Sequence, residues 1–246
     1  MKVLIINGSP RGKSSCTGCI LTSLCEGMKQ AGAKVQTIHL SEYQIQHCQG
    51  CFACWEKTPG KCVIKDDMGK LLEKLIEADL VIYGTPLYYF NMTGLMKDFM
   101  DRQLPLALPD AEESKTLKGV TRHLSRYSDG RKKIFLVSPC GFPEISHFHC
   151  LVALFKYIAK MIEADYLGEI LRPTAEMLKM PACQDQLCSY HDLLKVAGRQ
   201  LIEKEKIDDD VLKKLHEPWM SAEEFIKTLN EWSAKIKEET YEKNNA

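Results

Sequence analysis

Short apolar runs alternate with longer amphipathic stretches along the chain. Fully apolar runs at 2–7, 80–83 and 134–137 predict strands that are buried on both faces. Residues 35–40 alternate between apolar and polar positions and predict a further strand, and 165–171 contain another. The pattern therefore predicts five strands.

Helical periodicity fills the intervals between these strands. Apolar positions recur three and four residues apart, as in a helix with one buried face, within residues 15–31, 66–77, 93–104, 145–163, 186–204 and 221–237. Strands that alternate with helices form a parallel sheet that is covered on both faces. We therefore expect an α/β fold: a flavodoxin-like, doubly wound, five-stranded parallel sheet of order 2-1-3-4-5.

Two segments depart from this alternation. Residues 105–131 are polar and show little strand or helix pattern, so we expect a surface excursion there. From about residue 205 the chain is strongly charged. We expect one domain over residues 1–204 and a peripheral C-terminal helical extension over 205–246, with Trp219 and Trp232 as its anchors.

Composition narrows the class of protein. The 246 residues carry 33 basic and 33 acidic side chains, so no overall field favours nucleic acid or an anionic membrane. No apolar run approaches the roughly 18 residues of a membrane span. Only four apolar residues follow Lys2 before Asn7, too few for the core of a signal peptide. We expect a soluble cytoplasmic protein with neither nucleic acid nor membrane as a partner.

The loop after the first strand, residues 7–15, has the composition of a phosphate-binding segment. A strand that enters a polar loop and then a helix places unpaired backbone N–H groups where an anion can bind. A P-loop would need glycine at Asn7, and the spacing of Gly8 and Gly12 differs from that of a dinucleotide fingerprint. What remains is a hydroxyl-rich loop for a single phosphate, with Arg11 as a guanidinium and these residues beside it: Ser9, Ser14, Ser15, Cys16 and Thr17.

Two later loops carry aromatic and glycine residues to the same edge of the sheet. The third predicted strand is followed by Pro86, Leu87, Tyr88, Tyr89, Phe90 and Asn91. Exposed aromatic side chains there would be covered by a flat heterocycle stacked on them. The fourth predicted strand leads to Cys140, Gly141 and Phe142, and glycine allows the backbone to approach a ligand closely. Loops after strands 1, 3 and 4 converge at the carboxyl edge of such a sheet.

Together these three segments resemble the superfamily of NADPH-dependent FMN reductases and flavodoxin-like quinone reductases, over residues 1 to about 172. The resemblance implies that the first loop holds the FMN phosphate, while residues 86–91 and 140–142 border the ring. It implies an oxidoreductase that passes electrons from NAD(P)H through FMN to an acceptor, as a homodimer or homotetramer. The cofactor supplies the chemistry, so we assign no catalytic acid or base.

Four of the eleven cysteines form a cluster between the second strand and the next helix. The spacing Cys48-x2-Cys51-x2-Cys54-x7-Cys62 resembles the motif of the iron–sulfur flavoproteins, a branch of the same superfamily with a [4Fe–4S] cluster beside FMN. It also resembles flavodoxin-family oxidoreductases described only as FMN proteins. Zinc or a reversible dithiol is the third interpretation, and spacing alone does not separate the three.

Other classes of function make different predictions. A non-catalytic redox-sensing or zinc-binding module would bind no flavin, and a flavodoxin-like electron carrier is typically acidic, unlike this neutral chain. A phosphohydrolase would need a nucleophile and a base beside the phosphate loop. Cys16 starts the helix, where a thiol pKa can fall, but no histidine lies near it in the sequence.

Overall fold

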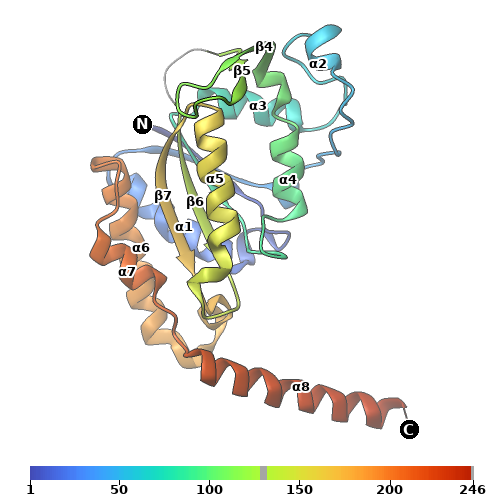
Figure 1. Cartoon of the computed structure of the whole chain (residues 1–246). Helices are drawn as coiled ribbons and strands as arrows, with labels where there is room; N and C mark the ends of the chain where they lie inside the picture. Colours follow the sequence, from blue (N-terminus) through green and yellow to red (C-terminus); the bar gives the residue numbers. More distant parts are fainter. Residues whose placement is uncertain (128–131, 245–246) are drawn as a thin grey trace.

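The central sheet contains five parallel strands, as predicted. The structure is a computed structural model and describes residues 1–127 and 132–244. The sheet has the order β2-β1-β3-β6-β7, which is the predicted flavodoxin-like order once a separate hairpin is set aside (Figure 1). The five strands are β1 (Lys2–Asn7), β2 (Lys34–His39), β3 (Leu80–Gly84), β6 (Lys133–Pro139) and β7 (Asp165–Arg172).

Helices cover both faces of this sheet because successive side chains of each strand point to opposite sides. Val3 and Ile5 of β1 face the helices α1 (Cys16–Gln30), α6 (Gln184–Glu203) and α7 (Asp209–His216). Leu4 and Ile6 face the helices α3 (Met68–Glu77), α4 (Gly94–Asp101) and α5 (His149–Met161). The uninterrupted apolar runs in the sequence are therefore strands buried on both faces.

The segment expected to be a surface excursion contains two strands that its sequence pattern did not predict. β4 (Ala107–Glu113) and β5 (Thr121–Ser125) form an antiparallel hairpin, drawn at the top of Figure 1. The sequence of β4 does not look like a strand because it contains Pro109 and three acidic side chains. The pairing of the two strands is irregular between Ala107 and Ala111. Residues 128–131 of the same expectation lie outside the described residues.

The charged end of the chain divides into two differently packed parts. Ile207, Val211 and Leu215 are buried in the same core as α1 and α6. In contrast, α8 (Ala222–Asn244) runs away from the body of the molecule (Figure 1). The Arg172 guanidinium carbon lies 4.0 Å from the centroid of the Trp219 ring. In contrast, Trp232 on α8 is 60% exposed. Within residues 1–127 and 132–244, no helix has the length and apolarity needed to cross a membrane.

Candidate functional site

The three loops singled out in the sequence meet at the carboxyl edge of the sheet, beyond β1, β3 and β6. They enclose a small cavity of about 70 Å³. Its walls include these predicted residues: Ser9, Arg11, Ser15, Cys16, Thr17, Pro86, Leu87, Tyr88, Cys140 and Gly141. Five other predicted residues lie outside these walls, namely Ser14, Tyr89, Phe90, Asn91 and Phe142.

The loop that follows β1 is shaped by the side chain of Asn7. Its amide nitrogen donates to the carbonyl of Gly12 at 3.0 Å, and its amide oxygen accepts from the backbone N–H of Ser9 at 3.0 Å. Gly12 has a φ of +54°, a conformation that glycine adopts without a steric penalty. Asn7, which excludes a P-loop, is thus the residue that holds this loop together.

The first turn of α1 is packed closely against the same loop. Ser15 is the N-cap, because its hydroxyl accepts from the N–H of Gly18 at 2.9 Å and donates to the carbonyl of Gly12 at 2.7 Å. A Cβ atom at Gly18 would lie 2.2 Å from the carbonyl oxygen of Lys13. Glycine at this position therefore allows the loop to fold back over the helix N-terminus.

Two hydroxyl groups in the cavity are buried without a partner. The side chains of Ser9 and Thr17 are each 1% exposed, and neither hydroxyl makes a hydrogen bond to any residue that the structure describes. Arg11 lies at the mouth, 3.5 Å from a carboxylate oxygen of Glu176. Buried hydroxyls without partners are costly, so the cavity has the donors that the oxygens of a phosphate group would satisfy.

The aromatic loop after β3 turns sharply. Tyr88 and Asn91 exchange backbone hydrogen bonds of 2.9 and 3.0 Å, and the two residues between them have positive φ angles, 48° for Tyr89 and 62° for Phe90. Tyr89 is 97% exposed. Non-glycine residues in this conformation are strained, and such strain concentrates at functional sites and ligand contacts.

Phe90 and Phe142 lie beside the cavity rather than in its walls. Both rings pack on His147, with centroid distances of 5.7 Å for Phe90 and 4.7 Å for Phe142. Phe142 also contacts Phe225 of α8 at 5.6 Å. This aromatic cluster joins the loops after β3 and β6 to the beginning of α8.

Sequence reasoning missed the fourth wall of the cavity. Pro139, Ala175 and Glu176 also line it, and the last two follow β7. Glu176 is 165 residues from Arg11 in the chain, and no local pattern links them. Only the order of strands in the sheet brings the two side chains together.

The thiols in this cavity are poor nucleophiles. Burial, together with the nearby Glu176 carboxylate, raises the pKa of Cys16 despite the helix N-terminus and the opposing charges of Lys179 and Arg11. Burial likewise raises the pKa of Cys140. Both groups are therefore neutral thiols near pH 7, and the expectation that the Cys16 pKa could fall is wrong because desolvation and the Glu176 carboxylate outweigh the charges of Lys179 and Arg11.

The four clustered cysteines converge on a second, smaller cavity. Cys48, Cys51, Cys54 and Cys62 all line a volume of about 20 Å³. Cys48 and Cys51 are exposed, whereas Cys54, in the short helix α2 (Ala53–Glu56), is buried. Burial and the neighbouring Cys62, Cys48 and Cys51 raise the pKa of Cys54, which places all four side chains within electrostatic range.

The cysteine side chains do not form a finished metal site. Over residues 1–127 and 132–244, no group of three or more His, Cys, Asp or Glu side chains is positioned to hold a metal ion. The cavity has room for about one water molecule. Residues 44–52 have no regular secondary structure, so the segment that carries Cys48 and Cys51 can change shape without breaking a helix or strand. The donor set is nevertheless that of an iron–sulfur or zinc centre.

A buried ion pair holds the base of this cysteine loop. The Arg102 guanidinium donates to both carboxylate oxygens of Asp66, at 2.7 and 3.0 Å, and to the carbonyl of Gln46 at 2.8 Å. Arg102 also lines the cavity of the cysteines. The bidentate contact therefore ties both ends of the cysteine segment to the end of α4.

The fold places the chain among flavodoxin-like α/β proteins. An FMN-dependent NADH-azoreductase from Bacillus anthracis in complex with FMN aligns with a TM-score of 0.58 at 19% identity, over 82% of this chain and all of that one. An NAD(P)H:quinone oxidoreductase from Methanothermobacter marburgensis aligns with a TM-score of 0.58 at 14% identity, over 82% of this chain and 96% of that one. At these identities the likeness is one of fold.

Sequence similarity then gives the family. Residues 1–120, just under half of the chain, match the family described as NADPH-dependent FMN reductase, so the predicted resemblance is confirmed over that part. An iron-sulfur flavoprotein of Archaeoglobus fulgidus is 44% identical over 102 residues, 42% of this chain and 48% of that protein. The iron-sulfur flavoprotein MJ0731 of Methanocaldococcus jannaschii is 40% identical over 119 residues, 48% of this chain and 57% of that protein. The matches thus span about half of these relatives.

Proposed function

We propose that the protein is an FMN-dependent oxidoreductase that takes electrons from NAD(P)H. The observation that carries this proposal is the pair of buried, unpartnered hydroxyls of Ser9 and Thr17 beside Arg11 at the N-terminus of α1. This arrangement suits the terminal phosphate of FMN. The match of residues 1–120 to the family of NADPH-dependent FMN reductases supports the same ligand.

The proposed roles of the residues follow from their positions. Ser9, Thr17 and Arg11 would bind the phosphate, while Ser15 keeps the loop in place as the helix cap. The backbone of Pro86 to Tyr88 and of Cys140 to Gly141 would border the ring. When bound, FMN supplies the hydride and electron chemistry of such enzymes. The chain's own contribution would be to hold the phosphate and to position the ring between these two backbone segments.

Removing the two hydroxyls tests the phosphate site. Ser9→Ala combined with Thr17→Val should raise the Kd of FMN at least about tenfold, since each hydrogen bond to a charged group contributes roughly 1.5–3 kcal/mol. Titration of FMN fluorescence measures the effect. Ser14→Ala is the matched control, because the Ser14 hydroxyl is exposed and donates to the Arg11 carbonyl. Equal FMN affinity in the double variant and the control would contradict the phosphate assignment.

We propose as a second function that Cys48, Cys51, Cys54 and Cys62 hold a [4Fe–4S] cluster. Their convergence on one cavity favours it, and so does the similarity to relatives named iron-sulfur flavoproteins, at 44% identity over 102 residues and 40% over 119. Four thiolates would bind the cluster, which supplies one-electron transfer. In that case the acceptor or donor would be a redox protein rather than a small molecule.

Metal analysis of protein purified without oxygen tests the cluster. We expect about four irons per chain, and Cys51→Ser should remove most of the iron while FMN stays bound. Cys188→Ser is the matched control, because Cys188 is also exposed but lies on α6. Zinc in place of iron would favour the zinc interpretation, and metal-free protein would leave the cysteines a structural or thiol role.

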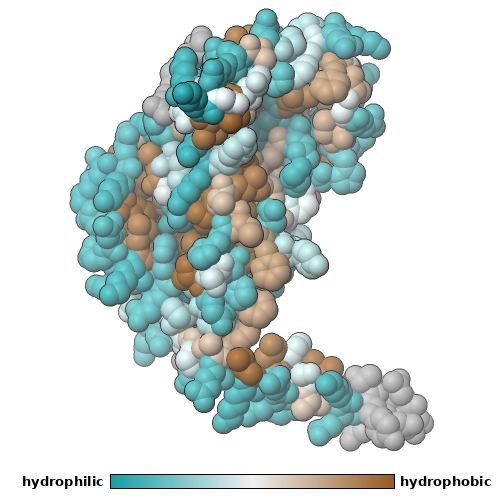
Figure 2. All heavy atoms as spheres, in the orientation of Figure 1, coloured by the Kyte–Doolittle hydropathy of each residue, from teal (hydrophilic) through white to brown (hydrophobic). Residues whose placement is uncertain are grey.

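We also propose that the protein is a homodimer or homotetramer. α8 presents a row of apolar side chains to solvent at helical spacing: Ile226, Leu229, Trp232 and Ile236. Figure 2 shows apolar atoms gathered along this helix, outside the body of the molecule. Exposed apolar rows of this kind are typical of protein–protein contacts.

A further inference from the structure

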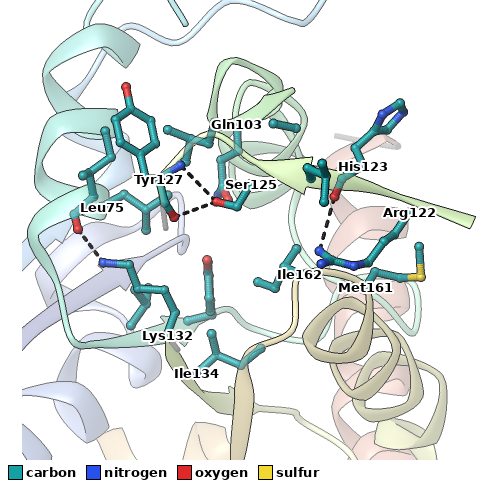
Figure 3. Close-up of a pocket in the computed structure, with 16 residues that line it drawn as sticks. Leu75, Gln103, Arg122, His123, Ser125, Tyr127, Lys132, Ile134, Met161 and Ile162 are labelled. Atoms are coloured by element: carbon teal, nitrogen blue, oxygen red, sulfur yellow. Dashed lines mark hydrogen bonds between the residues drawn. The ribbon is translucent and has the colours of Figure 1, made fainter. Parts of the chain in front are cut away.

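A larger cavity lies at the opposite edge of the sheet from the proposed flavin site. Its volume is about 330 Å³ (Figure 3). It is bounded by the beginnings of β3 and β6, the end of α5 and the β4–β5 hairpin. The size is at the lower end of the range of about 300–1,000 Å³ that small-molecule sites occupy.

The walls of this cavity are mainly apolar. Val81 and Ile134 come from the sheet, Leu75 from α3, and Met161 and Ile162 from the end of α5. In Figure 3, Gln103 and Ser125 lie above the cavity and Ile134 lies below it. Such a lining favours a ligand that is itself largely apolar.

Two hydrogen-bond donors in the lining have no acceptor. Gln103 Nε2 and Arg122 Nε are buried and make no hydrogen bond within the described part of the chain. Burial raises the pKa of Tyr83 to about 12, and the neighbouring Gln103 side chain opposes that rise. A ligand that brings an acceptor oxygen to Gln103 would remove the cost of leaving the amide unpaired.

The charged side chains in the lining of the cavity already have partners. Arg122 pairs with the carboxylates of Glu112 and Glu163, the latter at 2.8 Å. The Lys132 ammonium donates to the backbone carbonyls of Ile76 and Ala78, the second at 2.6 Å. An anionic ligand would therefore disturb existing pairs, so a neutral ligand suits the site better.

The cavity is separate from the proposed flavin site. Tyr83 lines the large cavity and Pro86, three residues further along the chain, lines the flavin cavity, but the two linings share no residue. A molecule in the large cavity and a flavin would therefore occupy different sites.

We propose that this cavity is a binding site for a neutral, largely apolar small molecule of two or three fused rings that carries a carbonyl-type acceptor. One turn of the chain, residues 103–106, lies between this cavity and the cavity of the cysteines. Leu104 and Pro105 line the cysteine cavity, whereas Gln103 and Leu106 of the same turn line the large one. Trp55 of α2 donates to the carbonyl of Ala107 at 2.9 Å. A ligand held there would restrain the segment that the cysteines pack against.

Equilibrium dialysis of 2-acetylnaphthalene against the FMN-loaded full chain tests the proposal. We expect saturable binding of one molecule per chain that excess FMN does not displace. Gln103→Leu should weaken binding about three- to tenfold, the effect of losing one hydrogen bond. The same variant should leave 2-ethylnaphthalene binding unchanged, because that probe lacks the carbonyl.

A second pair of variants keeps the test independent of Gln103. Ile162 lines the cavity and is 51% exposed, so Ile162→Trp should obstruct it and abolish binding of the probe. Met180→Trp is the matched control, since Met180 is 45% exposed and does not line the cavity. The proposal is overturned if binding is not saturable, if FMN competes with the probe, or if Ile162→Trp binds it as well as the control does.

Discussion

At the scale of single residues, the ion pair between Arg102 and Asp66 shows how burial changes the importance of a charge. The two side chains are 1% and 2% exposed. Burial alone would raise the pKa of Asp66, but hydrogen bonds from Arg102 and from the backbone N–H groups of Gln46 and Met68 outweigh it, so the net pKa is lowered. A complete buried ion pair adds little to the free energy of unfolding, but removing one member lowers that free energy strongly because the other charge stays buried without a partner.

We therefore expect Asp66→Asn to lower the free energy of unfolding by about 3–5 kcal/mol, because the Arg102 charge would stay buried without a partner. Urea unfolding followed by circular dichroism measures this. Asp67→Asn is the matched control: the Asp67 carboxylate is 33% exposed and 3.7 Å from Lys70, and its loss should cost less than about 1 kcal/mol.

The pH dependence of this difference provides a further check. Because the folded pKa of Asp66 lies below its ordinary value of 3.8, its stabilising effect is present above that pH and is lost as the pH falls through the folded pKa. The gap between the wild type and Asp66→Asn should therefore narrow below about pH 4. A gap that stays constant from pH 6 to pH 2 would contradict the assignment.

At the scale of elements, the contact between α1 and α6 depends on small residues. A Cβ atom at Gly27 would lie 2.0 Å from the carbonyl oxygen of Lys195, and one at Gly198 would lie 2.3 Å from that of Leu24. Each helix backbone thus rests directly on the other where they cross. Glycine inside a helix normally lowers its stability, so these positions are explained by packing rather than by helix propensity.

Gly198→Ala should destabilise the protein by about 1–3 kcal/mol, because the added methyl group forces the two helices apart. Gly69→Ala in α3 is the matched control, since nothing lies within 4 Å of a Cβ atom there. That change should stabilise the chain by about 0.5–1 kcal/mol. Thermal unfolding of both variants measures the two effects, and equal shifts in the same direction would show that the helix contact is not tight.

At the scale of the whole molecule, α8 is the element least supported by the rest of the chain. It begins beside the aromatic cluster at Phe225 and then runs away from the body, with its apolar row exposed (Figure 1). An isolated amphipathic helix is only marginally stable in water, which favours a partner for this surface. A second copy of the chain is the partner that we propose.

Charge introduced into the apolar row should therefore separate the subunits. Ile226→Lys combined with Trp232→Lys should reduce the mass measured by sedimentation velocity to that of one chain, because charged groups at the centre of an interface are strongly unfavourable. Asn230→Lys is the control with the same change of charge per site, and Asn230 is also exposed on α8. An unchanged mass in the double variant would exclude this surface as the interface.

The division of the chain at residue 204 stays a prediction. The charged composition after that residue set the expected boundary, yet Ile207 and Leu215 are buried in the core with α6, and only α8 stands apart. Many charged residues in a segment indicate that its helices have an exposed face. They do not indicate that the helices lie outside the core, because a helix with a charged outer face can still pack its inner face on a sheet.

The amino-acid sequence was enough to predict the strands and the three loops that follow them, because these depend on local signals: apolar runs, helical periodicity and the residues that follow a strand. The strand order was predicted from the doubly wound pattern that alternating strands and helices adopt. It also predicted most of the residues that line the small cavity, Ser9 and Thr17 among them. Tertiary structure alone decided which hydroxyls are left without partners, that Ser15 is used as a cap, and that Glu176 reaches Arg11. The β4–β5 hairpin and the large cavity beneath it were likewise invisible in the sequence. They arise from contacts between residues far apart in the chain, such as Arg122 with Glu163, and no local pattern encodes such contacts.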